Sequence, residues 1–271
     1  MFDLHMHSDF STDSESSPES MIEAAIHSGL SAICFTDHLD MDFPAPDAKH
    51  APFLLDTPAY FQKMQHLKDA YRGRIEILIG VELGLQPHLA DFHQRYLHTY
   101  PFDFVIGSSH LVHGEDPYEP AFFSGREESE AYTEYFQSIL DNLSAFTQID
   151  VYGHLDYVVR YGPNQNQYYS YTRYRNLIDA ILQQLIRHNI GLEINTGGYK
   201  YGLGEPNPCA EIIRRYIELG GETFTIGADA HEPSCVGDHF AELKELLIQC
   251  GVRYIAKFKN RQAAYFPIEE I

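Results

Sequence analysis

The chain has 271 residues, of which 44% are hydrophobic and 21% are charged, a composition typical of a soluble globular enzyme. Its formal net charge of −20 repels phosphate backbones and anionic lipid head groups, which argues against a nucleic-acid or membrane partner. Four scattered cysteines without C-x-x-C spacing suggest neither a disulfide framework nor a thiolate zinc site, and the lack of a long apolar run or signal-peptide pattern predicts a cytoplasmic protein.

Short apolar, β-rich segments recur along the chain, and each is followed by a helix-length segment with apolar residues three and four apart. The predicted strands are Phe2–Met6, Ala32–Phe35, Ile75–Val81, Phe102–Ile106, Val151–Gly153, Gly191–Ile194 and Thr223–Ile226. This alternation predicts one α/β domain over residues 1–271, with a parallel sheet that is either open or closed into a barrel. No glycine-rich phosphate loop follows the first strand, which argues against a nucleotide-binding sheet.

Capping residues and glycines mark the expected helix boundaries. Two N-cap residues, each followed by proline at the first helical position, are Ser17 before Pro18 and Thr57 before Pro58. Glycines that end helices are Gly29, Gly73 and Gly220. Polar tracts at residues 40–52, 113–125 and 162–171 are predicted to be loops after strand ends.

Every predicted strand end holds a potential metal ligand or another polar residue. These residues are His5 and His7, Asp37 and His38, Glu82, His110, His154, Asn195, and Asp229 and His231. Because the carboxyl ends of parallel strands meet on one face, residues far apart in sequence are expected to converge there. Imidazole and carboxylate without thiolate suit zinc, manganese or iron. The other histidines are expected at the surface or in the core: His27, His50, His66, His88, His93, His98, His113, His188 and His239.

Seven motifs in order resemble the polymerase and histidinol phosphatase (PHP) family of phosphoesterases, in particular its histidinol-phosphate phosphatase branch. They are Asp3-Leu4-His5-Met6-His7-Ser8, Phe35-Thr36-Asp37-His38, Gly80-Val81-Glu82, Gly107-Ser108-Ser109-His110, Gly153-His154-Leu155-Asp156, Glu193-Ile194-Asn195-Thr196 and Gly227-Ala228-Asp229-Ala230-His231. The resemblance covers the whole chain. It implies a distorted seven-stranded β/α (TIM-like) barrel that holds three divalent metal ions.

The same resemblance implies a ligand set for each ion. The first ion would be held by His5, His7, Glu82 and Asp229, the second by Glu82, His110 and His154, and the third by Asp13, His38 and His231. Some relatives carry histidine where this chain has Asp13, which could instead be an ordinary loop carboxylate. The implied reaction is hydrolysis of L-histidinol phosphate in histidine biosynthesis, with Glu82, Asp229 and His231 among the catalytic residues. Hydroxide between two ions bridged by Glu82 would attack the phosphorus.

A phosphomonoester also needs groups that bind its phosphate and its leaving group. Arg160, six residues after His154, is the first candidate for a phosphate clamp, although it could be an ordinary surface arginine. Lys200 is a second candidate, at a place where relatives often carry arginine. Glu115 and Asn207 are candidate acceptors for the ammonium and imidazole groups of histidinol phosphate, although solvated loop positions would explain them equally well.

Two other classes of function fit part of the pattern. A metal cluster could cleave another small phosphoester, a nucleic-acid end or a carbon–nitrogen bond, as amidohydrolase barrels do. The net charge of −20 disfavours nucleic acid, and no strand-end lysine is present for a carbamylated-lysine centre. A non-catalytic metal-binding module is the second alternative. The presence of a competent residue type at every ligand position argues against it.

Overall fold

A computed structural model describes residues 1–44 and 53–271. Most of the predicted loop at residues 40–52, including His50, therefore lies outside the described residues. The strands of the central sheet are β1 (Phe2–Met6), β2 (Ala32–Phe35), β3 (His38–Leu39), β4 (Glu76–Gly84), β5 (Phe104–Ser108), β6 (Val151–Tyr152), β7 (Gly191–Asn195) and β8 (Phe224–Gly227). The seven predicted strands are confirmed within a few residues. The short β3 was not predicted, and β4 continues past Val81, so that Glu82 lies within the strand.

The strands form a parallel sheet in the order β1-β2-β4-β5-β6-β7-β8, and β3 continues the line of β2 beside the second half of β4. Two main-chain hydrogen bonds join the first and last strands of this order. The amide of His7 donates to the carbonyl of Ala230 at 2.8 Å, and the amide of Asp229 donates to the carbonyl of His5 at 2.8 Å. The sheet is thus a nearly closed barrel, which confirms the predicted fold class.

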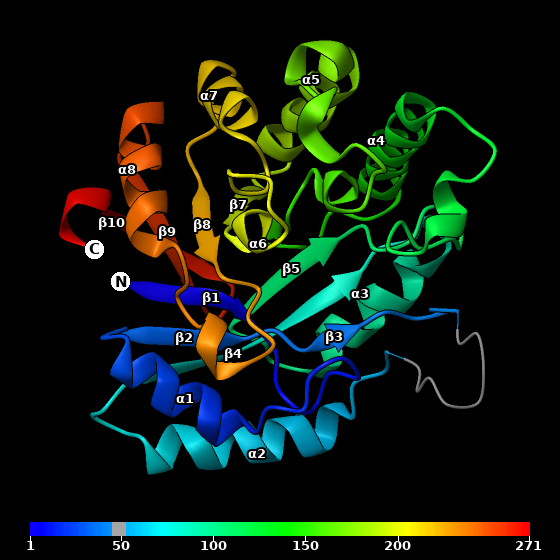
Figure 1. Cartoon of the computed structure of the whole chain (residues 1–271). Helices are drawn as coiled ribbons and strands as arrows, with labels where there is room; N and C mark the ends of the chain where they lie inside the picture. Colours follow the sequence, from blue (N-terminus) through cyan, green and yellow to red (C-terminus); the bar gives the residue numbers. More distant parts are fainter. Residues whose placement is uncertain (45–52) are drawn as a thin grey trace.

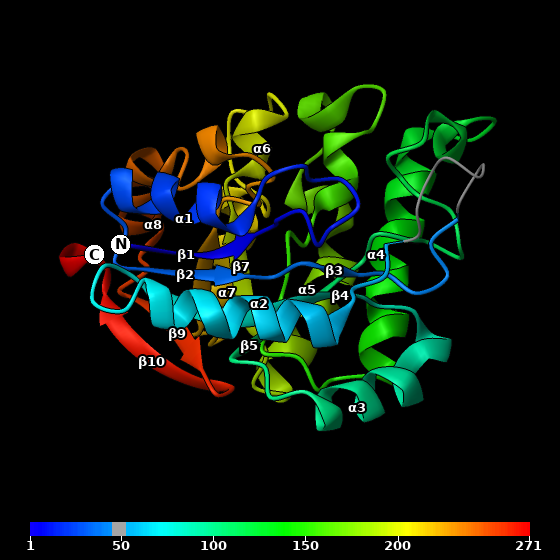
Figure 2. The ribbon, with the colours of Figure 1, turned by 90° about the horizontal axis from the view of Figure 1, so that it is seen from below.

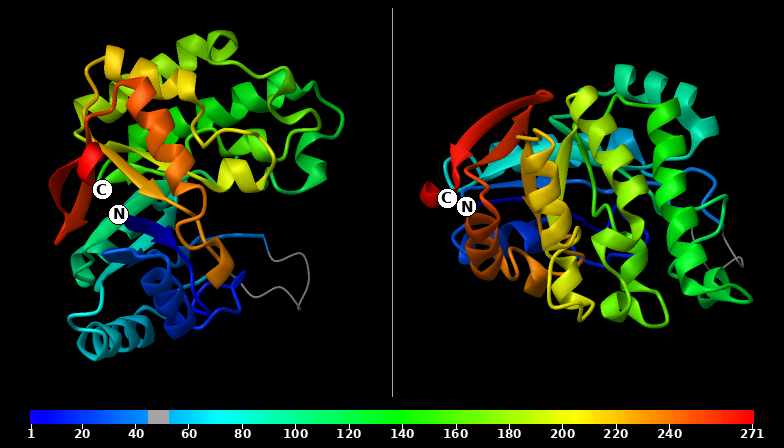
Figure 3. Two further views of the ribbon diagram at one scale, coloured as in Figure 1. Left: turned by 60° about the vertical axis from the view of Figure 1, so that its left-hand side comes forward. Right: turned by 90° about the horizontal axis from the view of Figure 1, so that it is seen from above.

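Helices surround the barrel on its outer side (Figures 1 and 3). The α-helices are α1 (Pro18–His27), α2 (Thr57–Ala70), α3 (Ala90–Thr99), α4 (Glu128–Ala145), α5 (Tyr171–Arg187), α6 (Gly197–Lys200), α7 (Ala210–Glu218) and α8 (Phe240–Cys250). The 3-10 turns are η1 (Pro87–Leu89), η2 (Pro120–Phe123), η3 (Tyr157–Arg160), η4 (Gln165–Gln167), η5 (Pro233–Cys235) and η6 (Ile268–Glu270). Within the described ranges, the helices all fall short of the length and apolarity that a bilayer crossing requires.

One of the two predicted N-caps is correct. The Ser17 hydroxyl accepts a hydrogen bond from the amide of Ser20 and caps α1. At α2 the prediction is wrong by one residue, because Asp56 is the cap and accepts from the amide of Ala59. The hydroxyl of Thr57 lies 2.7 Å from the hydroxyl of Tyr96 instead. The Thr57 side chain therefore makes a tertiary hydrogen bond with Tyr96 and does not cap the helix.

A C-terminal hairpin, which the sequence pattern did not predict, covers the end of the barrel where the strands begin. It consists of β9 (Tyr254–Lys259) and β10 (Gln262–Pro267), which pair antiparallel. Phe258 stacks on Phe104 with ring centroids 5.1 Å apart, and Phe266 meets Phe2 at 5.5 Å. Both partners lie at strand starts, so the hairpin closes the end opposite the predicted site (Figure 2).

Helix α3 carries a buried histidine that is expected to make stability depend on pH. His93 is fully buried, and burial lowers its pKa from 6.5 to about 4. The unfolded chain therefore binds a proton between these values that the folded chain does not, and stability falls as pH drops from about 6.5 towards 4. We expect His93→Leu to remove about 1–2 kcal/mol of the stability difference between pH 7 and pH 5. Urea unfolding of the original protein and of the variant at pH 7 and at pH 5 measures this difference in the free energy of unfolding.

The matched control for His93 is His98→Leu on the same helix, because His98 is exposed. This control should keep the pH dependence of the original protein. An unchanged pH dependence in His93→Leu would show that another group titrates in this range.

Candidate metal centre

The nine predicted ligands converge at the carboxyl ends of the barrel strands. They are His5, His7, Asp13, His38, Glu82, His110, His154, Asp229 and His231, and contacts between their side chains link them into one cluster. Most are buried, and His5, His7 and Glu82 are fully so. Their convergence is a consequence of the parallel sheet, since each lies within a strand or in the loop after it.

Glu82 occupies the middle of this cluster and divides its two carboxylate oxygens between two sets of histidines. Its Oε1 lies 2.9 Å from His154 Nε2 and 3.3 Å from His110 Nε2. Its Oε2 lies 3.2 Å from His5 Nε2 and 3.0 Å from His38 Nδ1. A carboxylate in this position can serve two cations at once.

A second carboxylate, Asp229, faces the two histidines of β1. Its Oδ1 lies 3.6 Å from His5 Nε2 and 3.3 Å from His7 Nε2, and the two Nε2 atoms are 3.1 Å apart. Asp229 has a positive φ of 55°, which is uncommon for a residue other than glycine. This backbone conformation accompanies the main-chain bond to His5 that closes the barrel.

Asp13 lies at the outer side of the cluster, where the resemblance places the third ion. Its Oδ2 is 3.0 Å from His231 Nε2 and 3.6 Å from His38 Nε2. The ring of His7 stacks on His38 and on His231, each with centroids 4.1 Å apart. The structure therefore brings Asp13 together with both histidines.

Several side-chain atoms of the cluster are buried without a hydrogen-bond partner among the described residues. They include Glu82 Oε2 and His38 Nδ1, which lie 3.0 Å apart without the geometry of a hydrogen bond, and His231 Nε2, which lies 3.0 Å from Asp13 Oδ2 in the same way. Within residues 1–44 and 53–271, four groups have ligand atoms within 4.8 Å of one another: His7, His38 and His231; His5, His7 and Asp229; His5, Glu82 and His154; and His38, Asp40 and His110. Unpaired nitrogen and oxygen atoms directed at common points fit divalent cations, which prefer such ligands.

The charges in the cluster shift the pKa values of its members in opposite directions. Burial alone would raise the pKa of Glu82, but the histidines His5, His110 and His38 hold it well below its usual range. Burial also opposes the charged form of His110, yet Asp40 and Glu82 raise its pKa to about 10. Cations bind neutral imidazole, so ion binding must displace protons from these rings.

Asp40 is a member of the cluster that sequence reasoning missed. It is buried, and its Oδ1 lies 2.7 Å from His110 Nδ1, on the side of the ring away from Glu82. Ser108 was also missed, and its hydroxyl donates to Glu82 Oε1 at 2.6 Å. The available signal for Asp40 was its position two residues after His38, which places both side chains on one side of an extended segment.

Arg160, the predicted phosphate clamp, is buried beside the cluster. Its guanidinium donates to Asn207 Oδ1 at 2.8 Å, to Asp229 Oδ2 at 3.0 Å and to Asn195 Oδ1 at 2.9 Å. These bonds use three of the five N–H groups of arginine. Among the described residues, no hydrogen-bond partner is found for the other two.

The other predicted substrate contacts lie in different surroundings. Both polar groups of Asn207 have protein partners, because its oxygen accepts from Arg160 and its nitrogen donates to Asp156 at 2.6 Å. The Glu115 side chain is 68% exposed and faces Arg126 at 3.8 Å. Lys200 is exposed at the end of α6. Its charge lies near Cys235, where burial raises the pKa of the thiol and Lys200 partly opposes that rise. Asn207 thus holds Arg160, and the substrate roles of all three remain predictions.

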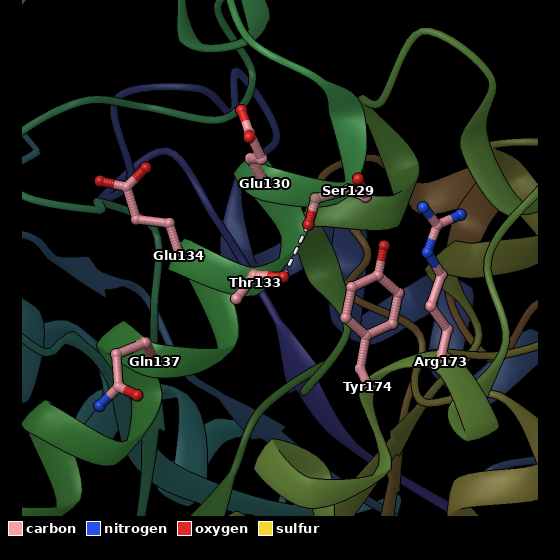
Figure 4. A pocket seen from close by; sticks show the side chains of 7 residues that line it. All are labelled: Ser129, Glu130, Thr133, Glu134, Gln137, Arg173 and Tyr174. Carbon is pink, nitrogen blue, oxygen red and sulfur yellow. Dashed lines mark hydrogen bonds between the residues drawn. The ribbon is translucent and has the colours of Figure 1, made fainter.

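A separate surface hollow of about 550 Å³ lies between α4 and the start of α5 (Figure 4). It is lined by residues of α4 such as Glu130 and Glu134, together with Arg173 and Tyr174. None of the predicted ligands lines it, and the chemistry described above belongs to the cluster at the strand ends.

The fold and the cluster define a β/α barrel with a histidine- and carboxylate-rich centre of the kind that binds metal ions. A family model described as "PHP domain" matches residues 3–197. The chain therefore belongs to the PHP domain family. Asp229 and His231 lie beyond the matched segment, and the barrel closure brings them back to β1.

The chain is also similar over nearly its whole length to individual proteins. It is 35% identical over 259 residues to the histidinol-phosphatase of Lactococcus lactis subsp. lactis (strain IL1403), covering 95% of this chain and 94% of that protein. It is 31% identical over 268 residues to a probable histidinol-phosphatase of Clostridium acetobutylicum, and the match covers 98% of this chain and 99% of that protein. A crystal structure of the histidinol phosphate phosphatase from Lactococcus lactis, complexed with zinc, L-histidinol and phosphate, matches with a TM-score of 0.89 and 31% identity over 97% of this chain and 98% of that one.

Proposed function

We propose that this chain is a histidinol-phosphatase that hydrolyses L-histidinol phosphate to L-histidinol and phosphate. The observation that carries the proposal is the convergence of nine ligand-type side chains, with Glu82 in the middle, in a chain 35% identical to a histidinol-phosphatase over 95% of its length. The solved relative with a TM-score of 0.89 holds zinc, L-histidinol and phosphate, which supports a small phosphomonoester as the substrate.

The proposed centre takes three divalent ions, of zinc, manganese or iron. His5, His7, Glu82 and Asp229 would hold the first, Glu82, His110 and His154 the second, and Asp13, His38 and His231 the third. The four ligand groups within 4.8 Å support several adjacent ions. When bound, such ions supply a nucleophile from water at neutral pH and neutralise phosphoryl charge.

The side chains around the ions prepare the reaction by orientation and charge. Glu82 keeps its carboxylate ionised between two sets of histidines, which aligns both sets for ligation. Arg160 would bind phosphoryl oxygens with its two free N–H groups, because its other donors fix it to Asn195, Asn207 and Asp229. We propose that residues 1–271 act as one catalytic unit, since the ligand-type residues extend from His5 to His231.

Steady-state kinetics on a panel of phosphomonoesters, with the metals in the purified protein quantified, tests this function. We expect kcat/KM for L-histidinol phosphate to exceed that for simple alkyl and aryl phosphates by about 10²-fold or more, because a site built for polar groups discriminates strongly against substrates that lack them. Equal turnover of all phosphomonoesters would contradict the substrate. Stoichiometric metal without turnover of any phosphomonoester would instead indicate a non-catalytic module.

Arg160→Lys is expected to lower kcat/KM by about 10²-fold, mainly through a higher KM, because lysine lacks the planar fork that reaches three acceptors and the phosphate together. The inhibition constant for inorganic phosphate should rise in parallel. Arg72→Lys is the matched control, since Arg72 is 80% exposed and pairs with Asp69 on the surface. Unchanged phosphate inhibition in Arg160→Lys would remove Arg160 from the phosphate site.

A further inference from the structure

Glu193 is a buried carboxylate inside the barrel to which neither the predicted ligand set nor the proposed mechanism gives a role. It lies in β7 and is 1% exposed. A glycine at the end of β8 leaves space for its side chain, because a Cβ added at Gly227 would lie 2.9 Å from Glu193 Oε1. On the other side, a Cβ added at Gly153 would make an ordinary contact with Oε2 at 3.4 Å. The carboxylate therefore sits between the ends of β6 and β8, where His154 and Asp229 follow.

The two oxygens of Glu193 contact two different ligand-bearing segments. Oε1 lies 2.5 Å from His5 Nδ1. Oε2 accepts a hydrogen bond from the main-chain amide of His154 at 2.8 Å and one from Asn195 Nδ2 at 3.2 Å. One carboxylate thus reaches the side chain of one predicted ligand and the backbone of another, on strands that do not pair with each other.

We propose that Glu193 is a positioning residue of the metal centre, which fixes the ring of His5 and the backbone at His154 at the same time. This inference rests on the proposed function. A carboxylate only accepts hydrogen bonds, so it requires the proton of neutral His5 to stay on Nδ1. The lone pair of Nε2 then faces Glu82 Oε2 at 3.2 Å and Asp229 Oδ1 at 3.6 Å, where the first ion would lie. Carboxylate–histidine pairs of this kind hold metal ligands in orientation and raise their basicity.

Glutamine cannot replace Glu193 in both contacts. Its amide has one acceptor oxygen and one donor NH₂ group, whereas the site presents a ring N–H on one side and a main-chain N–H on the other. If the oxygen faces His5, the NH₂ group opposes the amide of His154. The reverse orientation places NH₂ against His5 Nδ1 and favours the tautomer with the proton on Nε2. Either orientation disturbs one ligand while leaving side-chain volume unchanged.

Zinc titration of the metal-free Glu193→Gln protein, by competition with a chelator of known affinity, tests the role. We expect at least one ion to bind about 10- to 100-fold more weakly, and the zinc concentration for half-maximal activity to rise by the same factor. At saturating zinc, KM for L-histidinol phosphate should stay within about threefold of the original value, because Glu193 is only 1% exposed and contacts His5 on the inner side of the barrel. Glu76→Gln is the control, since it removes one carboxylate that pairs with Lys257 and Lys259 at the other end of the barrel.

Wild-type zinc affinity in a folded Glu193→Gln protein would overturn the inference. If that variant fails to fold, Glu193→Asp keeps two acceptor oxygens but withdraws them by one methylene, and unchanged zinc affinity there would overturn it equally. The titration is independent of substrate identity. A parent protein that binds zinc but does not turn over L-histidinol phosphate would therefore contradict the proposed function and leave the result for Glu193 valid.

Discussion

Replacing Glu82 by glutamine is expected to lower kcat/KM for L-histidinol phosphate by about 10³-fold or more. Both carboxylate oxygens of Glu82 face histidines at 2.9–3.3 Å, and these histidines belong to different predicted ions. The glutamine amide has one acceptor oxygen and no charge. One of the two pairs of histidines would therefore face an NH₂ group where Glu82 presents a carboxylate oxygen. The variant should lose bound metal together with activity.

Three measurements check the effect of Glu82→Gln: kcat/KM, metal content and circular dichroism of the folded protein. The substitution is nearly isosteric, which limits packing changes at this fully buried position. Glu76→Gln again provides the control for loss of one carboxylate from β4. Retention of more than a tenth of the activity at full metal content would show that Glu82 does not bridge ions.

Removal of the metal ions is expected to abolish turnover and to lower the melting temperature. Without ions, buried carboxylates and histidines such as Glu82 and His38 lose their compensating partners. Ligands that bind only the folded state stabilise it by about 4 kcal/mol at a thousandfold excess over Kd. Treatment with a chelator, followed by addition of zinc, manganese or iron(II), should therefore restore activity and thermal stability together.

The restoration experiment also discriminates among metals, because the ion that restores the highest kcat at the lowest concentration identifies the preferred one. Full activity in a protein shown by elemental analysis to lack metal would contradict the proposed centre. Restored stability without restored activity would indicate that the ions bind but do not take part in hydrolysis.

Most of the barrel was predictable because hydrophobic periodicity and glycine stops are local signals. The strands Phe2–Met6 and Ala32–Phe35 were predicted with their observed bounds. The C-terminal hairpin was missed because no residue of β10 is buried, and because β9 packs on Phe104 and β10 on Phe2, which are both far away in sequence. No local pattern encodes such a contact.

The candidate centre was predictable to the extent that its ligand types follow strands. His5 and Asp229 are far apart in sequence, but a parallel sheet brings strand ends together whatever lies between them. Residues that orient ligands left a weaker signal, since Asp40 and Glu193 resemble ordinary acidic residues until their partners are placed. Nothing in the sequence indicated the hydrogen bonds that Asn207 makes within the protein, to Arg160 and to Asp156, because both partners are distant in sequence.

The junction between β1 and β8 has a consequence for the motions of the protein. Its two main-chain bonds run from the amides of His7 and Asp229, so the bonds that complete the barrel lie within the residues proposed to hold the first ion. Local opening at this junction would separate those ligands, and bound cations should therefore suppress it. Amide hydrogen exchange at positions 7 and 229 should be slower in the metal-loaded protein than in the chelated one, while amides in β9 and β10 should exchange equally in both.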